Sequence, residues 1–293
     1  MTAPQAKTKA KEVYTLFAQS GLKDFTPFGE TQKAKAAYRK EMHELAKNNP
    51  NGLFGLAFLS DYENNWEQAL SYFKKAYSEY RHSLTGINYA AYLSRLNYYN
   101  ESLTIFSNIL YEYPNDEILL TRIIESLAES LIPDKLDKLL DIYNGSHKNV
   151  FQEIIEKQKH LKATLEEFNI SIDFYRLLRK LSRDVFFKYF TAETSRNLDE
   201  IYDYDHNLIL LENRIPYTSF EYALRNLPYP KQYEKITELI SQMNDEFQNN
   251  LIDYMYSEQG PFTRSEFRRQ SALLKLIFIP ELPNTTEQYQ DAS

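Results

Sequence analysis

The sequence predicts an all-α protein, or nearly so, in which a superhelix of paired helices precedes a mostly helical second domain. Three observations lead to this fold class. Glycine is scarce, with 7 residues among 293, which argues against many strands joined by tight turns. Tyrosine and phenylalanine are abundant, with 24 and 18 residues, and these rings suit packing between helices. Residues 50–143 repeat an apolar pattern at helical spacing.

The first predicted helix covers residues 31–47, which are rich in Ala, Lys, Glu and Gln and end at Asn48-Asn49-Pro50. Two windows farther along the chain then match each other residue by residue. The matching residues lie 33 positions apart: Trp66 and Tyr99, Ala69 and Ser102, Phe73 and Phe106, and Ala76 and Ile109.

An apolar helix precedes each window, with Leu53 and Leu56 in the first unit and Tyr89 and Leu93 in the second. Each unit is therefore a helix, a short polar turn and a second helix. One such pair cannot bury its apolar side alone, but stacked pairs can. A period in this range consequently indicates an α-solenoid.

The repeat resembles the tetratricopeptide family. That family has a small residue at the closest helix crossing, an aromatic residue one turn later, and a proline near the end of the unit, as Pro114 is here. The resemblance covers about a third of the chain, and Arg81 stands where the first unit would have its proline. It implies units at about residues 50–82, 83–116 and 117–143, the third one shortened, after a degenerate helix at 31–47.

The resemblance also implies a partner-binding groove, because the first helix of each tetratricopeptide pair lines a concave surface. Carried over to this chain, the groove residues are Phe54, Phe58, Tyr62, Asn88, Ala91, Arg95, Arg122 and Glu125. This mixture of apolar residues and arginine is typical of an interface core. Some tetratricopeptide arrays clamp a C-terminal carboxylate with lysine and asparagine residues at the groove positions. Asn88 is the one groove residue here that matches this set, which argues against a receptor for chaperone tails. For Phe54 and Phe58 the alternative is packing against helix 31–47.

Asn144-Gly145-Ser146 interrupts the pattern and predicts a boundary between domains 1–145 and 146–293. The pattern near residues 207–215 fits one or two short strands or a buried helix. The polar residues 284–293 are expected to form a loose tail. Predicted helices of the second domain cover residues 149–168, 172–190 and 230–258, and a capping box at Thr263–Glu266 predicts a last helix that runs to Phe278.

The predicted helix at residues 172–190 offers a second docking face, for phosphates or an acidic protein. At about 100° per residue, its basic residues fall opposite its apolar ones. The alternative is an ordinary solvated face, partly neutralised by Asp173 and Asp184. The basic residues are Arg176, Arg179, Lys180 and Arg183.

The sequence contains no recognisable catalytic machinery. Cysteine is absent, no phosphate-binding or nucleophile motif occurs, and the five histidines are scattered. The carboxylates and His206 within residues 199–207 have ligand types that suit a divalent cation, but their spacing matches no calcium loop. A solvated acidic turn is the preferred interpretation. We therefore predict no catalytic residue, no metal site, no cofactor and no enzymatic activity.

The net charge of −7 argues against broad binding of nucleic acid. No apolar run of signal-peptide length follows the polar residues 1–11, and the most apolar stretch, 272–280, is too short to span a bilayer. These features predict a cytoplasmic protein without a membrane segment.

The predicted function is that of an adaptor or scaffold, which binds a peptide or helical segment of another protein in the repeat groove. Two alternatives stay open. One is an acidic neutralising partner of a basic effector, such as an immunity protein or antitoxin. The other is a peptide-sensing regulator of the tetratricopeptide type. The abundance of aromatic residues also permits a homodimer.

Overall fold

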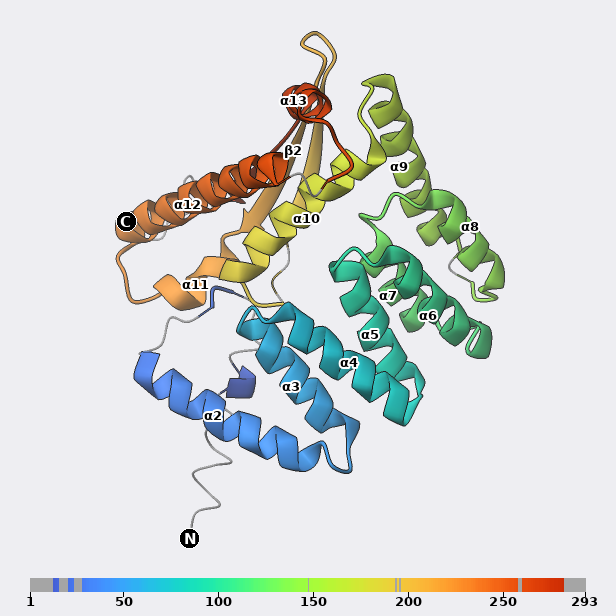
Figure 1. The fold of residues 1–293 in the computed structure, drawn as a ribbon, viewed down its shortest axis with the longest axis vertical. Helices are drawn as coiled ribbons and strands as arrows, with labels where there is room; N and C mark the ends of the chain where they lie inside the picture. The colour runs from blue at the N-terminus through green and yellow to red at the C-terminus, as the bar shows by residue number, and fades with distance from the viewer. Residues whose placement is uncertain are drawn as a thin grey trace, which may run out of the picture. The chain divides into compact units, whose positions relative to one another are not determined.

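The computed structural model describes residues 13–15, 21–23, 28–146, 148–192, 194, 196–257 and 260–281. These residues are mostly helical and include one three-stranded sheet, which confirms the predicted fold class (Figure 1). Residues 284–293, the predicted loose tail, lie outside the described part of the chain.

The chain forms two compact units. Residues 32–180 belong to the first unit, and residues 181–281 belong to the second. Residues 146–180, which the sequence assigns to the second domain, are thus part of the first unit. The helix α10 (Ile172–Tyr189) begins in the first unit and ends in the second.

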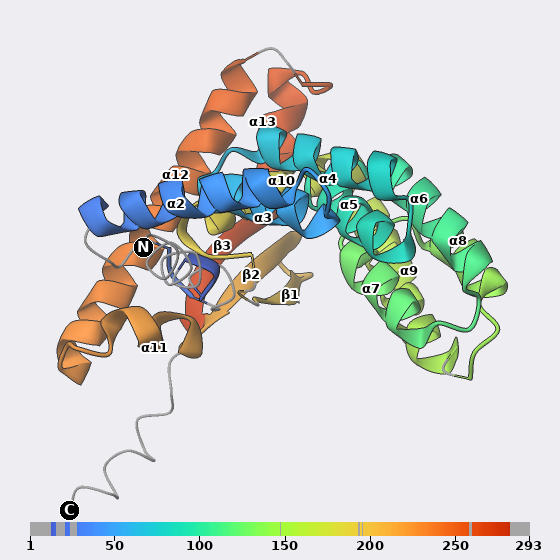
Figure 2. The same ribbon diagram turned by 90° about the horizontal axis from the view of Figure 1, so that it is seen from below.

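The first unit consists of successive helices, in which short turns join the members of each pair (Figures 1 and 2). The helix α9 packs against α7 and α8 and so extends the array beyond the predicted third unit. The bounds are α2 (Phe28–Leu45), α3 (Pro50–Tyr62) paired with α4 (Trp66–Tyr80), α5 (Ser83–Arg95) paired with α6 (Tyr99–Glu112), α7 (Glu117–Leu127) paired with α8 (Pro133–Ile142), and α9 (Lys148–Glu167).

The period of 33 residues extends to the backbone of the turns. Asn64 and Asn97 both have positive φ, 60° and 67°, a conformation that asparagine tolerates better than most residues. The amide that follows each of them bonds back to the last turn of the preceding helix, which closes the helix end. Asn169, after α9, has the same conformation, with φ of 56°. The turn geometry therefore occurs at three places in the array.

Small residues allow the two helices of a pair to approach closely. The Ser102 hydroxyl donates to the Ala90 carbonyl at 2.7 Å, which joins α6 to α5. Ala69 is fully buried at the equivalent position of α4. The small residues that the sequence analysis places at the helix crossings are therefore buried in both pairs.

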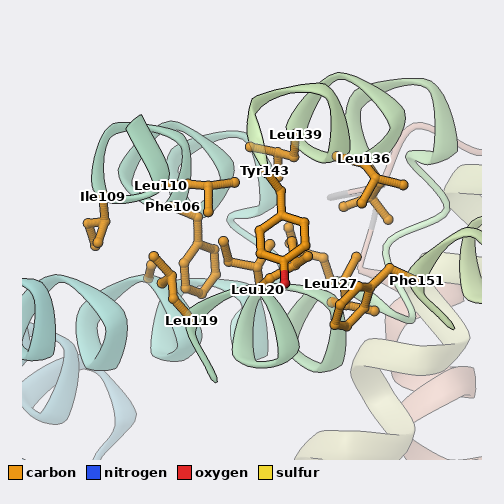
Figure 3. Packing of buried hydrophobic residues seen from close by; sticks show 14 of the residues in the cluster. Phe106, Ile109, Leu110, Leu119, Leu120, Leu127, Leu136, Leu139, Tyr143 and Phe151 are labelled. Carbon is orange, nitrogen blue, oxygen red and sulfur yellow. The ribbon is translucent and has the colours of Figure 1, made fainter. Parts of the chain in front are cut away.

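A cluster of buried hydrophobic residues lies between the later pairs and α9 (Figure 3). The ring of Tyr143 occupies the space between α8 and α7, and it meets the ring of Phe151 edge to face at 6.2 Å. Because Phe151 comes from α9, the cluster joins α9 to the helix pairs. Its other labelled members are Phe106, Ile109, Leu110, Leu119, Leu120, Leu127, Leu136 and Leu139.

The second unit packs helices around a sheet with strand order β1-β2-β3, in which β1 is antiparallel and β3 parallel to β2. The strand near residues 207–215 is confirmed as β2, and α12 confirms the predicted long helix. The bounds are β1 (Asn197–Asp203), β2 (Leu208–Pro216), α11 (Thr218–Leu224), α12 (Tyr229–Tyr256), α13 (Arg264–Leu273) and β3 (Leu274–Glu281).

The prediction of a last helix that runs to Phe278 is wrong. The capping box is present, with the Thr263 side chain accepting from the Glu266 amide, but the helix ends at Leu273. The next residues form β3, where Leu274, Leu276 and Phe278 are buried at alternate positions. In β3 these residues form their backbone hydrogen bonds with β2 instead of within a longer helix.

Candidate functional site

The helix α3 does not expose to solvent the aromatic groove residues that the resemblance implies. Phe54 is buried with its ring 6.1 Å from that of Phe73 on α4, and Phe58 is half-buried at 5.6 Å from the same ring. Tyr62 is also buried, with the Lys35 ammonium 4.7 Å from its ring centre. Phe54 and Tyr62 are thus core residues rather than exposed binding residues, and the partner of Phe54 is α4.

The helix α2 covers α3, and two glycines allow the close approach (Figure 2). A Cβ atom on Gly55 would lie 2.3 Å from the Met42 sulfur, and one on Gly52 would lie 2.2 Å from the Ala46 nitrogen. Two glycines three residues apart in a glycine-poor chain are the signal that could have predicted this contact. Because α2 covers α3, the first helices of the next two pairs, α5 and α7, remain as candidates for a binding surface.

The helices α5 and α7 pack beside each other and present equivalent residues to solvent. Leu84 of α5 is 51% exposed and Ile118 of α7 is 76% exposed, although both are large aliphatic side chains. They lie 34 positions apart in the sequence, as do the other matched residues of the two helices. We name this surface the α5–α7 face. It comprises Leu84, Asn88, Ala91, Ile118, Arg122 and Glu125.

The polar end of the α5–α7 face carries one charge of each sign. Arg122 and Glu125 form an ion pair at 3.4 Å, with side chains 66% and 60% exposed. An exposed pair one helical turn apart contributes little to stability, so both charges remain accessible to a partner. Asn88 and Ala91 on α5 are half-buried. The structure therefore brings together four of the eight predicted groove residues: Asn88, Ala91, Arg122 and Glu125.

Arg95, a further predicted groove residue, holds the array together instead. Its guanidinium forms an ion pair with Asp61 at 2.8 Å, and the two side chains are only 16% and 4% exposed. The Tyr92 hydroxyl donates to the same carboxylate at 2.9 Å. Burial, followed by the nearby Asp61 charge, raises the pKa of Tyr92 well above its usual value. This cluster ties α5 to α3, and the sequence analysis missed Asp61 because it lies within an otherwise apolar helix.

The predicted basic docking face on α10 is largely buried. Arg179 is fully buried and pairs with Glu129, and Arg183 is also buried. Arg176 donates to the Ser130 carbonyl at 2.9 Å. Burial acts to lower the pKa of Arg179, but the Glu129 carboxylate, together with Tyr175 and Tyr99, raises this pKa above its usual value, so the guanidinium stays charged. Of the four basic residues, Lys180 alone is classed as exposed, so the expected face does not form.

The acidic segment 199–207 forms the end of β1 and the turn that follows it. Its most defined contact joins His206 Nδ1 to Asp203 at 2.8 Å, and the backbone hydrogen bond from His206 lowers the pKa of Asp203. Among the described residues, no three His, Asp or Glu side chains come together in a way that would hold a metal ion. Within the same residues, no helix is both long enough and apolar enough to cross a membrane.

Comparison with protein-family models, with curated proteins and with solved structures finds no match to this chain.

Proposed function

We propose that this chain is a non-enzymatic protein-interaction module whose α5–α7 face binds a helical segment of a partner protein. The observation that carries the proposal is the pair of aliphatic side chains, Leu84 and Ile118, exposed at equivalent positions of neighbouring helices. A single exposed aliphatic residue is ordinary, but a matched pair beside polar residues is typical of an interaction surface.

The spacing of the two aliphatic residues favours a helix as the bound segment. Packed helix axes lie about 8–10 Å apart, so equivalent residues on α5 and α7 are separated by roughly this distance. Residues i and i+7 of a helix are about 10 Å apart along its axis. A partner helix laid across α5 and α7 would therefore place one apolar residue over Leu84 and another, two turns away, over Ile118.

The charged end of the face would set the orientation of that helix. Arg122 and Glu125 would exchange their mutual ion pair for partner groups of opposite charge. Such rim charges contribute to specificity and association rate more than to affinity. The resemblance to tetratricopeptide repeats supports peptide binding, but a fold does not determine a function, so the proposal rests on the face itself.

The test is affinity capture of partner proteins from the native lysate, with identification by mass spectrometry. The test variant combines Leu84→Asn with Ile118→Asn, which removes both aliphatic contacts at exposed positions. A matched control combines Leu227→Asn with Ile252→Asn, because these side chains are 36% and 49% exposed and lie outside the array. Circular dichroism and thermal unfolding should show that both variants are folded.

We expect a partner that the wild-type protein and the control retain and that the Leu84/Ile118 variant loses. A partner retained equally by all three proteins would reject the α5–α7 face. Loss of the partner in both variants would show a nonspecific effect of surface polarity, which would also reject the face.

A further inference from the structure

Among the described residues, the sheet of the second unit has an open edge at β1. The strand β1 pairs with β2 along its whole length, from Asn197 opposite Arg214 to Asp203 opposite Leu208. Among the described residues, no strand lies along the other side of β1. The backbone N–H and C=O groups along such an edge can bond to an added strand.

A side chain covers the opposite edge of the sheet at one residue, Phe278 of β3. Asn244 of α12 donates through its amide nitrogen to the Phe278 carbonyl at 3.0 Å, and its amide oxygen accepts from the Phe278 N–H at 2.8 Å. This pair of bonds reproduces what a neighbouring strand would supply to β3 at that residue. Asn244 thus occupies the β3 edge at Phe278, whereas within the described residues no further strand pairs with β1.

The strand β1 lacks three of the features that usually protect an edge. Natural edge strands are often very short, or contain proline or a bulge. The strand β1 has seven residues, contains no proline and keeps a continuous register with β2. Ile201, near its middle, is 44% exposed. Charged side chains also protect edges, and β1 carries three of them, so a strand that pairs here has to match their charge.

The charges along β1 select the kind of strand that would fit. Its charged residues are Asp199, Glu200 and Asp203, all acidic. Arg214 on β2 pairs with Asp199 at 2.6 Å and also with Glu212 at 2.7 Å, so one cation is shared between two carboxylates. Directly opposed residues on paired strands are stabilised by opposite charges and destabilised by like charges.

We propose that the open edge of β1 accepts a basic β-strand from a partner protein. The incoming strand places lysine or arginine opposite Asp199, Glu200 and Asp203, and an apolar residue opposite Ile201. A second copy of β1 is a poor occupant, because two acidic strands would oppose each other. The proposal is independent of the α5–α7 face, since it rests on a different set of residues.

The test uses the capped, fluorescently labelled peptide Lys-Tyr-Val-Lys-Lys-Val, with binding to the full-length protein measured by fluorescence anisotropy at low salt. In an antiparallel arrangement this peptide places lysines opposite the three acidic residues and valine opposite Ile201. Its matched control is Glu-Tyr-Val-Glu-Glu-Val. We expect the basic peptide to bind about tenfold more tightly than the acidic one, and added salt should reduce the difference.

Backbone pairing is tested on the peptide, so that the protein is left intact. The basic peptide is N-methylated at alternate residues in either of the two registers, which keeps its charge but removes the N–H donors along one side. Methylation in one of the two registers should abolish binding, because it removes the N–H groups that face β1. Equal binding by both methylated peptides and by the parent peptide would overturn the proposal, because it would show that charge alone accounts for the interaction.

A charge reversal on the protein locates the contact. Glu200→Lys should reduce binding of the basic peptide about tenfold, whereas Glu234→Lys on α12 makes the same change in net charge away from the strand and should have little effect. Equal effects of the two variants would place the peptide elsewhere and overturn the proposal.

Discussion

Replacing Arg95 with methionine should destabilise the array strongly, because Arg95 neutralises a buried carboxylate. Methionine keeps the apolar stem and removes the guanidinium that pairs with Asp61 at 2.8 Å. Removing one partner of a buried ion pair costs about 3–5 kcal/mol. Since the side chain of Arg95 is 16% exposed, water can reach the site in part, and we expect the lower end, about 3 kcal/mol.

The matched control for this change is Arg122→Met. Arg122 also pairs with an acidic residue, Glu125, but both side chains are more than half exposed. The expected change in the free energy of unfolding is therefore within about 0.5 kcal/mol. Both variants are compared with the wild-type protein by urea unfolding, followed by circular dichroism, with the slope of the transition checked for each protein.

A double-mutant cycle with Asp61→Asn separates the ion pair from other effects of the substitution. The coupling energy between positions 61 and 95 should exceed about 1 kcal/mol. Equal destabilisation by Arg95→Met and Arg122→Met, or a coupling energy near zero, would refute the reasoning. The same contact makes charge reversal at Arg95 unsuitable as a test of partner binding, because Arg95→Glu would place a second carboxylate beside Asp61.

Two further predictions concern the α2–α3 contact and a tyrosine of the second unit. Gly52→Ala should cost about 2–3 kcal/mol, because its Cβ would meet backbone atoms. Gly55→Ala should cost less, since its Cβ would mainly meet the flexible Met42 side chain; equal shifts in melting temperature would contradict this. Burial, then the hydrogen bond to Glu246, raises the pKa of Tyr189 to about 12. The pKa of Tyr189 in the folded protein lies above the unfolded value of about 10, so the protonated hydroxyl contributes to the free energy of unfolding. This contribution is complete below pH 10 and is lost as pH rises through 12. Absorbance titration at 295 nm should show one tyrosine titrating at lower pH in Glu246→Gln than in the wild-type protein, because burial remains and the effect of the carboxylate is lost; an unchanged titration would contradict the assignment.

The helix pairs could be predicted from sequence because their signal is local and repeated. Ala69 and Ser102 recur at a fixed spacing, and the pattern of one unit supports the interpretation of the next. The exposed face could not be predicted in the same way. Whether Phe54 is core or surface depends on which helices pack against α3, and that is a property of the assembled unit.

The errors for residues 146–293 also arise from contacts between residues that are distant in the sequence. A helical wheel places Arg179 on a polar side, but Glu129, 50 positions earlier in the sequence, pairs with it in the interior. Residues 274–278 follow a helix with a proper cap, and their change to a strand depends on pairing with β2. Local patterns contain no information on such pairings, so these two features required the structure.

The recurrence of the turn at Asn64 and Asn97 has a consequence for how the array opens and how it could be lengthened. Each helix pair is held mainly by its neighbours, so its stability behaves as a chain of coupled segments. Hydrogen exchange should then be slowest in the central helices α5 and α6 and faster toward the ends of the array. Duplicating residues 83–116 would insert one more segment and add another row of side chains to the α5–α7 face.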